Sequence, residues 1–106
     1  MKVLMTGGGT AGHVNPAIAI AEEFKRLGAE VTGIIGFRHR DLLILEEEFS
    51  SCCDTLTVMT DDGSYGRGGN VTVPLKEMLE NGEKFDMIIT IGPLIMMKFV
   101  VETARP

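Results

Sequence analysis

Six residues near the start of the chain have the types and spacing of a turn that holds a phosphate. They read Gly-Gly-Gly-Thr-Ala-Gly, which satisfies the pattern G-x-G-x-x-G, and they follow the apolar run 3–5. A strand that ends in such a turn, with a helix after it, aims backbone N–H groups and a helix N-terminus at one point. The alternative is a tight turn whose glycines only let strand and helix pack closely. The candidate anion ligands are the turn residues and the histidine after them: Gly7, Gly8, Gly9, Thr10, Ala11, Gly12 and His13.

A second candidate, Arg38, follows the apolar run 31–36. A site selective for NAD has an acidic residue at the end of this second strand, where it binds the ribose hydroxyls. Here the position is basic, and a guanidinium suits the 2′-phosphate of NADPH. If a dinucleotide binds, we expect NADPH rather than NADH. The alternative is that Arg38 and Arg40 only balance the glutamates at 46–48.

Two further loops carry candidate ligands. The stretch 60–70 holds four glycines in eleven residues, which predicts a surface loop without regular structure. Its adjacent aspartates are expected to order the loop through bonds to the backbone rather than to act as an acid/base pair. We predict no catalytic residue and no metal ligand. The candidate cofactor-binding residues in the two loops are Asp61, Asp62, Gly63, Ser64, Gly92 and Pro93.

These loops need an α/β scaffold in which strands and helices alternate. Apolar runs predict strands at 2–6, 31–36, 56–59 and 87–91, and spacings of three and four residues predict helices at 15–27, 42–49, 73–79 and 94–103. Asp41 is expected to cap the second helix, Pro16 to lie in the first turn of the first, and Gly28 to end that helix. We predict one domain, 1–106, with a parallel sheet of about four strands in the order 3-2-1-4, helices on both faces, and a missing last strand.

The charge, the cysteines and the apolar runs of the chain limit which partners and which cellular compartment we expect. The net charge is −5, with 15 acidic and 10 basic residues, which argues against nucleic acid or an anionic membrane. Cys52 and Cys53 are adjacent and too poorly placed for a mutual disulfide, so we expect reduced thiols in a cytoplasmic protein. No apolar run reaches the length of about 18 residues that a membrane span needs.

The first part of the chain resembles one known family. Residues 1–30, with Thr6-Gly7-Gly8-Gly9-Thr10-Ala11-Gly12-His13-Val14-Asn15-Pro16-Ala17, are similar to the N-terminus of the N-acetylglucosaminyltransferase that makes lipid II. The resemblance implies that the glycine turn and its histidine lie beside the cleft that takes the acceptor's diphosphate.

Residues 31–106 resemble a second family. The segments 34–38, 41–46, 60–66 and 91–98 are similar to the NADPH-dependent ferredoxin oxidoreductase (sulfide dehydrogenase) and the electron-transfer subunit of dihydroorotate dehydrogenase. In that family the module holds the pyridine nucleotide. The resemblance implies that Arg38 and the loop 61–66 lie near the adenosine half, and Gly92-Pro93 near the nicotinamide.

The two resemblances predict a Rossmann-like module joined from two parents, with a seam near residues 29–32. We expect it to bind NADPH or another nucleotide or phosphate without catalysis of its own, and to hold neither FAD nor an iron–sulfur cluster. The alternatives are the nucleotide-binding part of an electron-transfer reductase, a fragment of the glycosyltransferase, and a scaffold with no activity. An open, apolar strand at 87–91 predicts a homodimer or an exchange of elements.

Overall fold

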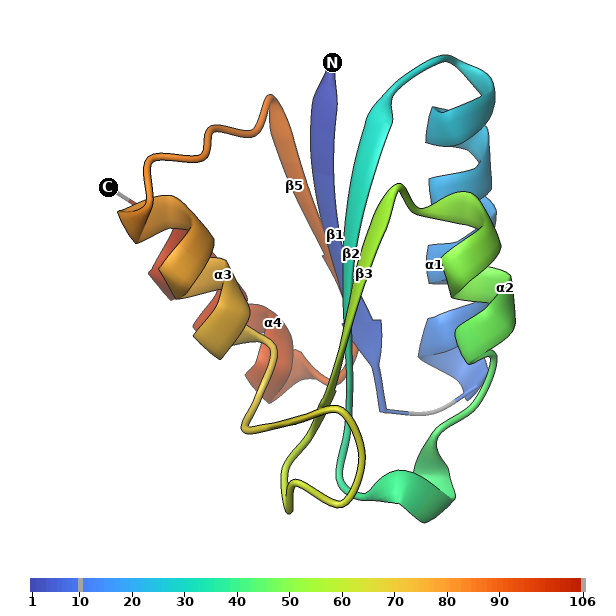
Figure 1. Cartoon of the computed structure of the whole chain (residues 1–106), viewed down its shortest axis with the longest axis vertical. Coiled ribbons are helices and arrows are strands. Elements are labelled where there is room, and N and C mark those ends of the chain that lie inside the picture. Colours follow the sequence, from blue (N-terminus) through green and yellow to red (C-terminus); the bar gives the residue numbers. More distant parts are fainter. Residues whose placement is uncertain (10, 106) are drawn as a thin grey trace.

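The computed structural model describes residues 1–9 and 11–105 as one α/β domain of three layers (Figure 1). Strands and helices alternate along the chain, as the apolar pattern predicts. The elements are β1 (Lys2–Gly8), α1 (Ala11–Arg26), β2 (Glu30–Phe37), the short 3-10 helix η1 (Arg40–Leu42), α2 (Glu46–Cys52), β3 (Thr55–Thr60), β4 (Arg67–Gly68), α3 (Thr72–Glu80), β5 (Met87–Ile91) and α4 (Leu94–Ala104).

The sheet is parallel throughout, in the order β4-β3-β2-β1-β5. The four main strands therefore take the predicted order, and the α/β class is confirmed. A fifth strand, the two-residue β4, was not predicted. The register sets Gly8 opposite Gly36, so the ends of β1 and β2 lie side by side.

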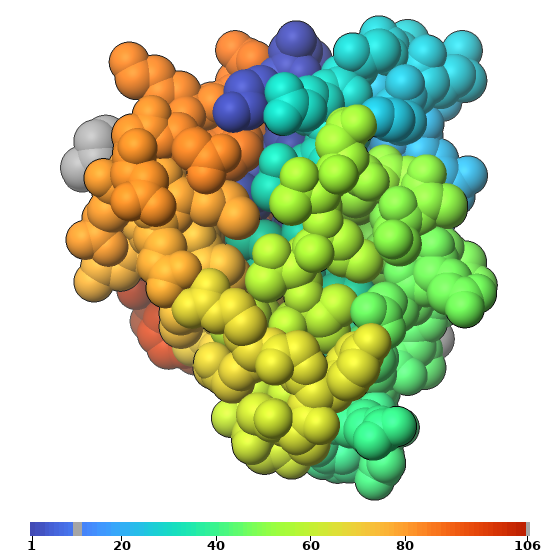
Figure 2. Space-filling model, in the orientation of Figure 1, coloured from blue at the N-terminus to red at the C-terminus, as the bar shows by residue number. Residues whose placement is uncertain are grey.

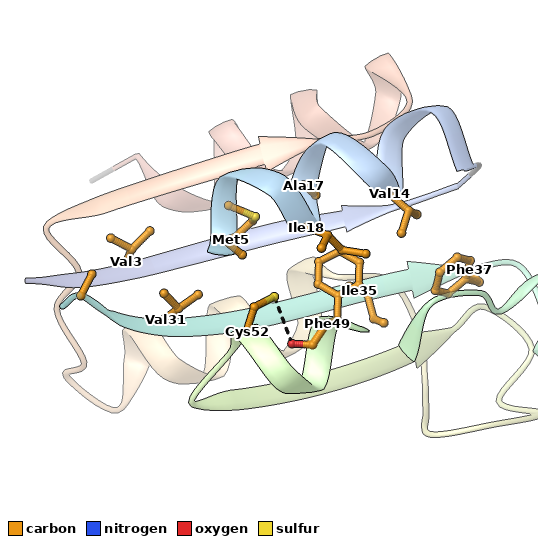
Figure 3. Close-up of a cluster of buried hydrophobic side chains, with 12 residues drawn as sticks. Val3, Met5, Val14, Ala17, Ile18, Val31, Ile35, Phe37, Phe49 and Cys52 are labelled. Atoms are coloured by element: carbon orange, nitrogen blue, oxygen red, sulfur yellow. Dashed lines mark hydrogen bonds between the residues drawn. The ribbon is translucent and has the colours of Figure 1, made fainter. Parts of the chain in front are cut away.

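Helices cover both faces of the sheet. Figure 1 shows α1 and α2 on one side, with α3 and α4 on the other. Figure 3 shows the first core, in which Phe49 of α2 packs beside Ile18 of α1 and Ile35 of β2. A second core joins Leu4 and Ile34 of the sheet to Leu75 of α3. Each such side chain contributes about 1.5–3 kcal/mol when it is fully buried, which explains why both helix layers stay attached.

Helix α1 begins four residues before its predicted start. Pro16 therefore lies inside the helix, where it cannot donate to the Gly12 carbonyl, and not in the first turn. The helix also ends one residue before its predicted end, because Leu27 follows it and is 68% exposed. Gly28 ends the helix as predicted, with φ at +88° and its N–H donating to the Lys25 carbonyl at 3.0 Å.

The single helix predicted at 42–49 is wrong. The chain forms η1, then the irregular stretch 43–45, and only then α2. Residues 43–45 are partly buried apolar side chains that pack against the first core. A regular helix would turn one of three consecutive side chains away from this core, whereas the irregular backbone of 43–45 sets all three against it. Asp41 lies within η1 and does not cap a helix, while Leu45 precedes α2 in the left-handed region with φ at 60°.

The loop after β3 folds back on the strand it leaves. Arg67 and Gly68 pair with Met59 and Thr60 to form β4, so the prediction of no regular element was wrong there. Gly66 permits this return, because its φ is +64° and a Cβ on it would lie 2.3 Å from the Val58 carbonyl oxygen. In a parallel sheet, the loops after β1, β2, β3 and β5 all meet at one edge. This edge is the candidate site.

Candidate functional site

A hollow of about 570 Å³ lies at the carboxyl edge of the sheet. Its size falls within the range of about 300–1,000 Å³ that is usual for small-molecule sites. Polar residues line one part and apolar residues of α4 line another. The lining includes Gly9, Gly36, Arg38, Asp61, Asn70, Thr72, Pro93, Ile95, Met96 and Phe99.

The glycine turn contributes Gly9 alone to this lining among the described residues. Gly7 is buried in β1, where a Cβ would lie 3.3 Å from that of Ala17. Gly8 faces the backbone of β2, and a Cβ on it would lie 1.9 Å from the Gly36 carbonyl oxygen. Both residues therefore serve close packing, the alternative reading of the motif. Gly9 donates its N–H to Gly36 at 3.2 Å and has φ at +91°.

The rest of the motif lies at the start of α1. Thr10 is outside the described residues, while Ala11 and Gly12 form the first turn of the helix. His13 is half-buried, and its Nδ1 lies 3.4 Å from the position of a Cβ on Gly9. His13 is therefore close to Gly9, but neither it nor Gly12 lines the hollow as Arg38 and Asp61 do.

Arg38 and Asp61 extend the ends of β2 and β3 and line the same hollow. Both are exposed. The Asp61 N–H donates to the Phe37 carbonyl at 2.9 Å, which continues the pairing of the two strands. Within 1–9 and 11–105 neither side chain makes an ion pair or hydrogen bond. The structure thus brings a cation and an anion to one edge, and sequence reasoning had considered only the cation for selectivity.

Asp62, Gly63 and Ser64 order the loop after β3. Asp62 accepts the N–H and the hydroxyl of Ser64 on Oδ1, at 3.0 and 2.7 Å. These bonds lower the pKa of the Asp62 carboxyl, because they favour its charged form. Gly63, with φ at +72°, donates its N–H to the Thr60 carbonyl at 3.2 Å. Asp62 thus has the ordering role expected of the aspartates, and none of the three residues lines the hollow.

Thr60 anchors this loop, a role that no local sequence pattern indicates. Its side chain is fully buried at the end of β3. The hydroxyl donates to the Tyr65 carbonyl at 2.7 Å and accepts the Tyr65 N–H at 3.2 Å, while the Thr60 carbonyl accepts from Gly69 at 3.0 Å. Tyr65 in turn donates to the Glu46 carboxylate at 2.7 Å, and this bond raises the pKa of the phenol. The loop is therefore anchored, and its aspartates have defined positions.

Gly92 and Pro93 join β5 to α4. Gly92 is buried, and a Cβ on it would lie 2.0 Å from Cε of Met96. Pro93 lines the hollow and precedes α4, with its carbonyl accepting the N–H of Met97 at 3.1 Å. Met96 packs on the second core and also lines the hollow.

The apolar side of the hollow that α4 forms was not predicted from the sequence. Ile95 and Phe99 are 58% and 45% exposed and lie one helical turn apart on the hollow. Their spacing of four residues is the signal that could have found them, because it sets two large apolar side chains on one helix face. Asn70 and Thr72, just before and at the start of α3, also line the hollow and were not predicted. The Asn70 Oδ1 accepts the Thr72 N–H at 2.9 Å.

Neither a metal cluster nor a membrane-spanning helix is found in the part of the chain that the structure describes. No three residues of the metal-binding types gather there. No helix in residues 1–9 and 11–105 is both long and apolar enough to cross a bilayer. The two cysteines are free thiols; Cys52 is buried and donates to the Phe49 carbonyl at 3.4 Å (Figure 3).

The parallel order of the strands, the two helix layers and the hollow at the carboxyl edge define a Rossmann-like α/β domain. The family model of the Glycosyltransferase family 28 N-terminal domain matches residues 3–75, and by this match the chain belongs to that family.

Over almost its whole length the chain is homologous to reductase subunits. It is 46% identical over 104 residues to the probable dihydroorotate dehydrogenase B (NAD(+)), electron transfer subunit, of Methanocaldococcus jannaschii, with 98% of this chain and 39% of that protein covered. The Thermotoga maritima homolog of this subunit is 40% identical, with 98% and 36% covered. The chain therefore spans well under half the length of these curated relatives.

Solved structures agree with these relatives. The chain matches the NADH-dependent reduced ferredoxin-NADP oxidoreductase with a TM-score of 0.83 and 35% identity, covering 98% of this chain and 36% of that one. The flavohemoglobin of Malassezia yamatoensis matches with a TM-score of 0.65 at 20% identity, covering 99% and 29%, and shows the fold alone.

A seam near residue 30 finds no support in these comparisons. The match to the glycosyltransferase model runs through this point to residue 75, and the alignment to the archaeal reductase subunit covers 98% of the chain. The similarity to the reductase subunits confirms the resemblance predicted for residues 31–106. It also includes the first βα unit, which the sequence assigned to the glycosyltransferase alone.

Proposed function

We propose that this chain is the pyridine-dinucleotide-binding part of an electron-transfer reductase. The observation that carries the proposal is the hollow at the carboxyl edge, where Arg38 and Asp61 lie on one side and Pro93, Ile95 and Phe99 on the other. NADPH has a matching division, with the 2′-phosphate of its adenosine ribose toward one end and the flat nicotinamide ring at the other. A flavin held by another part of the reductase would supply the electron chemistry.

The polar end bears on the choice between the two dinucleotides. Arg38 supports NADPH, because a guanidinium donates paired N–H groups to a phosphate. Asp61 supports NADH, because a carboxylate accepts from the ribose hydroxyls and repels a 2′-phosphate. We favour NADPH, since Arg38 has no ion pair in the described structure that would neutralise it.

The apolar end supports a place for the nicotinamide. Ile95 and Phe99 stay substantially exposed although they are large and apolar. A flat ring lying against them would remove this apolar surface from water, and each Å² buried would contribute about 25 cal/mol of binding free energy. Gly9 lies at the same part of the hollow, since a Cβ on it would be 3.0 Å from the Pro93 ring. Its lack of a side chain leaves the backbone open to a ligand.

Calorimetric titration of the full chain tests the proposal. We expect NADPH to bind with micromolar affinity, NADH more weakly, and Arg38→Ala to remove the difference. Arg26→Ala is the matched control, because Arg26 pairs with Glu23 on α1 and does not line the hollow. A titration with neither dinucleotide producing heat would refute the proposed function.

A second candidate, binding of a sugar nucleotide, is supported by the glycosyltransferase family match to residues 3–75. That match ends before Pro93 and α4, which form the apolar side of the hollow. We rank it below the reductase for this reason. Titration with UDP-N-acetylglucosamine separates the two, because heat with this ligand alone would favour the glycosyltransferase reading.

We further propose that the chain associates with itself through β5. Among the described residues β5 pairs with β1 alone, so its other side is an open edge. Met87 at its start is 41% exposed. Open edges recruit other strands, and an apolar side chain beside one adds to this tendency.

A further inference from the structure

The loop after β3 holds the segment after β2 at two points. The Asp62 N–H donates to the Arg38 carbonyl at 3.3 Å, and the Arg40 N–H donates to Oγ of Ser64 at 2.8 Å. The two bonds lie on either side of residue 39, so this short segment cannot move independently of the loop. Figure 2 shows the two segments, green and yellow, beside each other at the lower end of the molecule.

Ser64 is fixed by Asp62 in turn. Its hydroxyl accepts from Arg40 while it donates to Asp62 Oδ1, which also accepts the Ser64 N–H. Hydrogen bonds in such a chain polarise and strengthen one another. Neither Asp62 nor Ser64 lines the hollow, so their polar groups act on the protein backbone and not on a ligand.

The position of the Arg38 side chain depends on these backbone bonds more than that of an ion-paired side chain would. Its guanidinium lines the hollow and makes no ion pair or hydrogen bond with the described residues, so only its backbone determines where it can reach. A charged donor must meet its acceptor within a few tenths of an ångström to form a good bond. The position of the Arg38 backbone therefore controls what its side chain can bind.

We propose that Asp62 and Ser64 form a clamp that positions Arg38 and thereby sets the preference for a 2′-phosphate without touching the ligand. This inference rests on the proposed dinucleotide binding. Asp62 and Ser64 are positioning residues, and their removal leaves the binding of the rest of the dinucleotide intact.

Ser64→Ala tests the clamp, with Kd for NADPH and NADH measured by calorimetry on the full chain. We expect NADPH binding to weaken about fivefold, part of the roughly tenfold to hundredfold that a charge-assisted hydrogen bond carries. NADH binding should change by less than about twofold, as for an ordinary surface substitution. Ser51→Ala is the matched control, because Ser51 makes a similar bond to the Glu48 carbonyl on α2, away from the hollow.

Two further variants separate positioning from general stability. Asp62→Ala should act like Ser64→Ala, whereas Asp62→Asn should keep the preference, since an amide oxygen can accept the same two bonds. In an Arg38→Ala background, Ser64→Ala should leave the ratio of the two Kd values unchanged, because both act through one group.

The outcomes distinguish the clamp from the proposed function. If the unmodified chain binds neither dinucleotide, the proposed function is wrong and the clamp with it. If the chain binds NADPH but Ser64→Ala and Asp62→Ala keep the NADPH-to-NADH ratio, the clamp alone is wrong. An equal loss for both dinucleotides, with a lower unfolding midpoint, would also overturn it, because that is the result of a merely structural role.

Discussion

Gly8 and Gly36 lie directly opposite each other at the ends of β1 and β2, with no room for a side chain between them. A Cβ on Gly8 would lie 1.9 Å from the Gly36 carbonyl oxygen, and this same oxygen accepts the Gly9 N–H at 3.2 Å. The contact is between two backbones, so no side-chain rearrangement can relieve it. The first glycines of the motif therefore let the end of β1 approach its neighbour, and this approach places Gly9 at the hollow.

We predict that Gly8→Ala lowers the free energy of unfolding by about 3–5 kcal/mol, from a left-handed φ and a backbone clash together. The measurement is a urea unfolding curve. Gly28→Ala is the control: its φ is also positive, at +88°, but nothing lies within 4 Å of the added Cβ. It should cost only about 1–2 kcal/mol. Equal losses for the two variants would show that the contact with Gly36 is unimportant.

The fold was largely predictable because each main strand carries a short apolar segment, and a helix pattern follows it. β5 matches its predicted bounds of 87–91, and α3 and α4 begin within one residue of theirs. Errors arose where tertiary packing decided the backbone. The apolar positions between 42 and 49 suit a helix, but the first core takes the three consecutive side chains of 43–45, which a regular helix could not provide. The pairing of Arg67 with Met59 depends on the backbone conformations of nearby glycines. A glycine-rich composition predicts only an irregular loop, so this pairing could not be predicted.

Arg38 and Asp61 should have opposite effects on dinucleotide choice. Asp61→Asn removes a charge that repels a 2′-phosphate, so we predict NADPH binding about threefold to tenfold tighter, while NADH weakens slightly. Asp41→Asn is the control, because Asp41 is an exposed aspartate of η1 that does not line the hollow. The measurement is the ratio of the two Kd values at fixed salt. A ratio that moves toward NADH would mean that Asp61 does not face the 2′-position.

The site was only partly predictable, and the reason is physical. Arg38, Asp61 and Pro93 follow strands, and the topology rule alone brings them to one edge. Phe99 comes from the second turn of α4, so its place at the hollow depends on the direction of that helix. Ser64 accepts from the backbone of Arg40, a residue 24 positions earlier. No local pattern records such partners.

Self-association through β5 should depend on Met87. We predict that the sedimentation coefficient of the unmodified chain rises with concentration, and that Met87→Lys abolishes this rise, because a charge beside an open edge disfavours strand pairing. Leu27→Lys is the control, since Leu27 is an apolar residue with 68% exposure after α1 and away from β5. A chain that stays monomeric at every concentration would contradict the proposed use of this edge.

Cys53 should make the protein sensitive to alkaline pH. Its burial beside Gly33 raises the pKa of the thiol from about 9 to about 12, chiefly because the charged thiolate is poorly solvated there. A group whose pKa is higher in the folded state stabilises the fold fully below its unfolded pKa and loses this effect as pH rises through the folded value. We therefore expect the urea concentration at the unfolding midpoint to decrease as the pH rises from 9 to 12. This decrease should be smaller in Cys53→Ala. The two proteins are compared by the change in midpoint with pH, because the substitution also alters the midpoint itself. At pH 8 the folded thiol should react with iodoacetamide far more slowly than the unfolded one. Fast alkylation of the folded chain at Cys53 would show that the thiolate is accessible and that burial does not set its pKa.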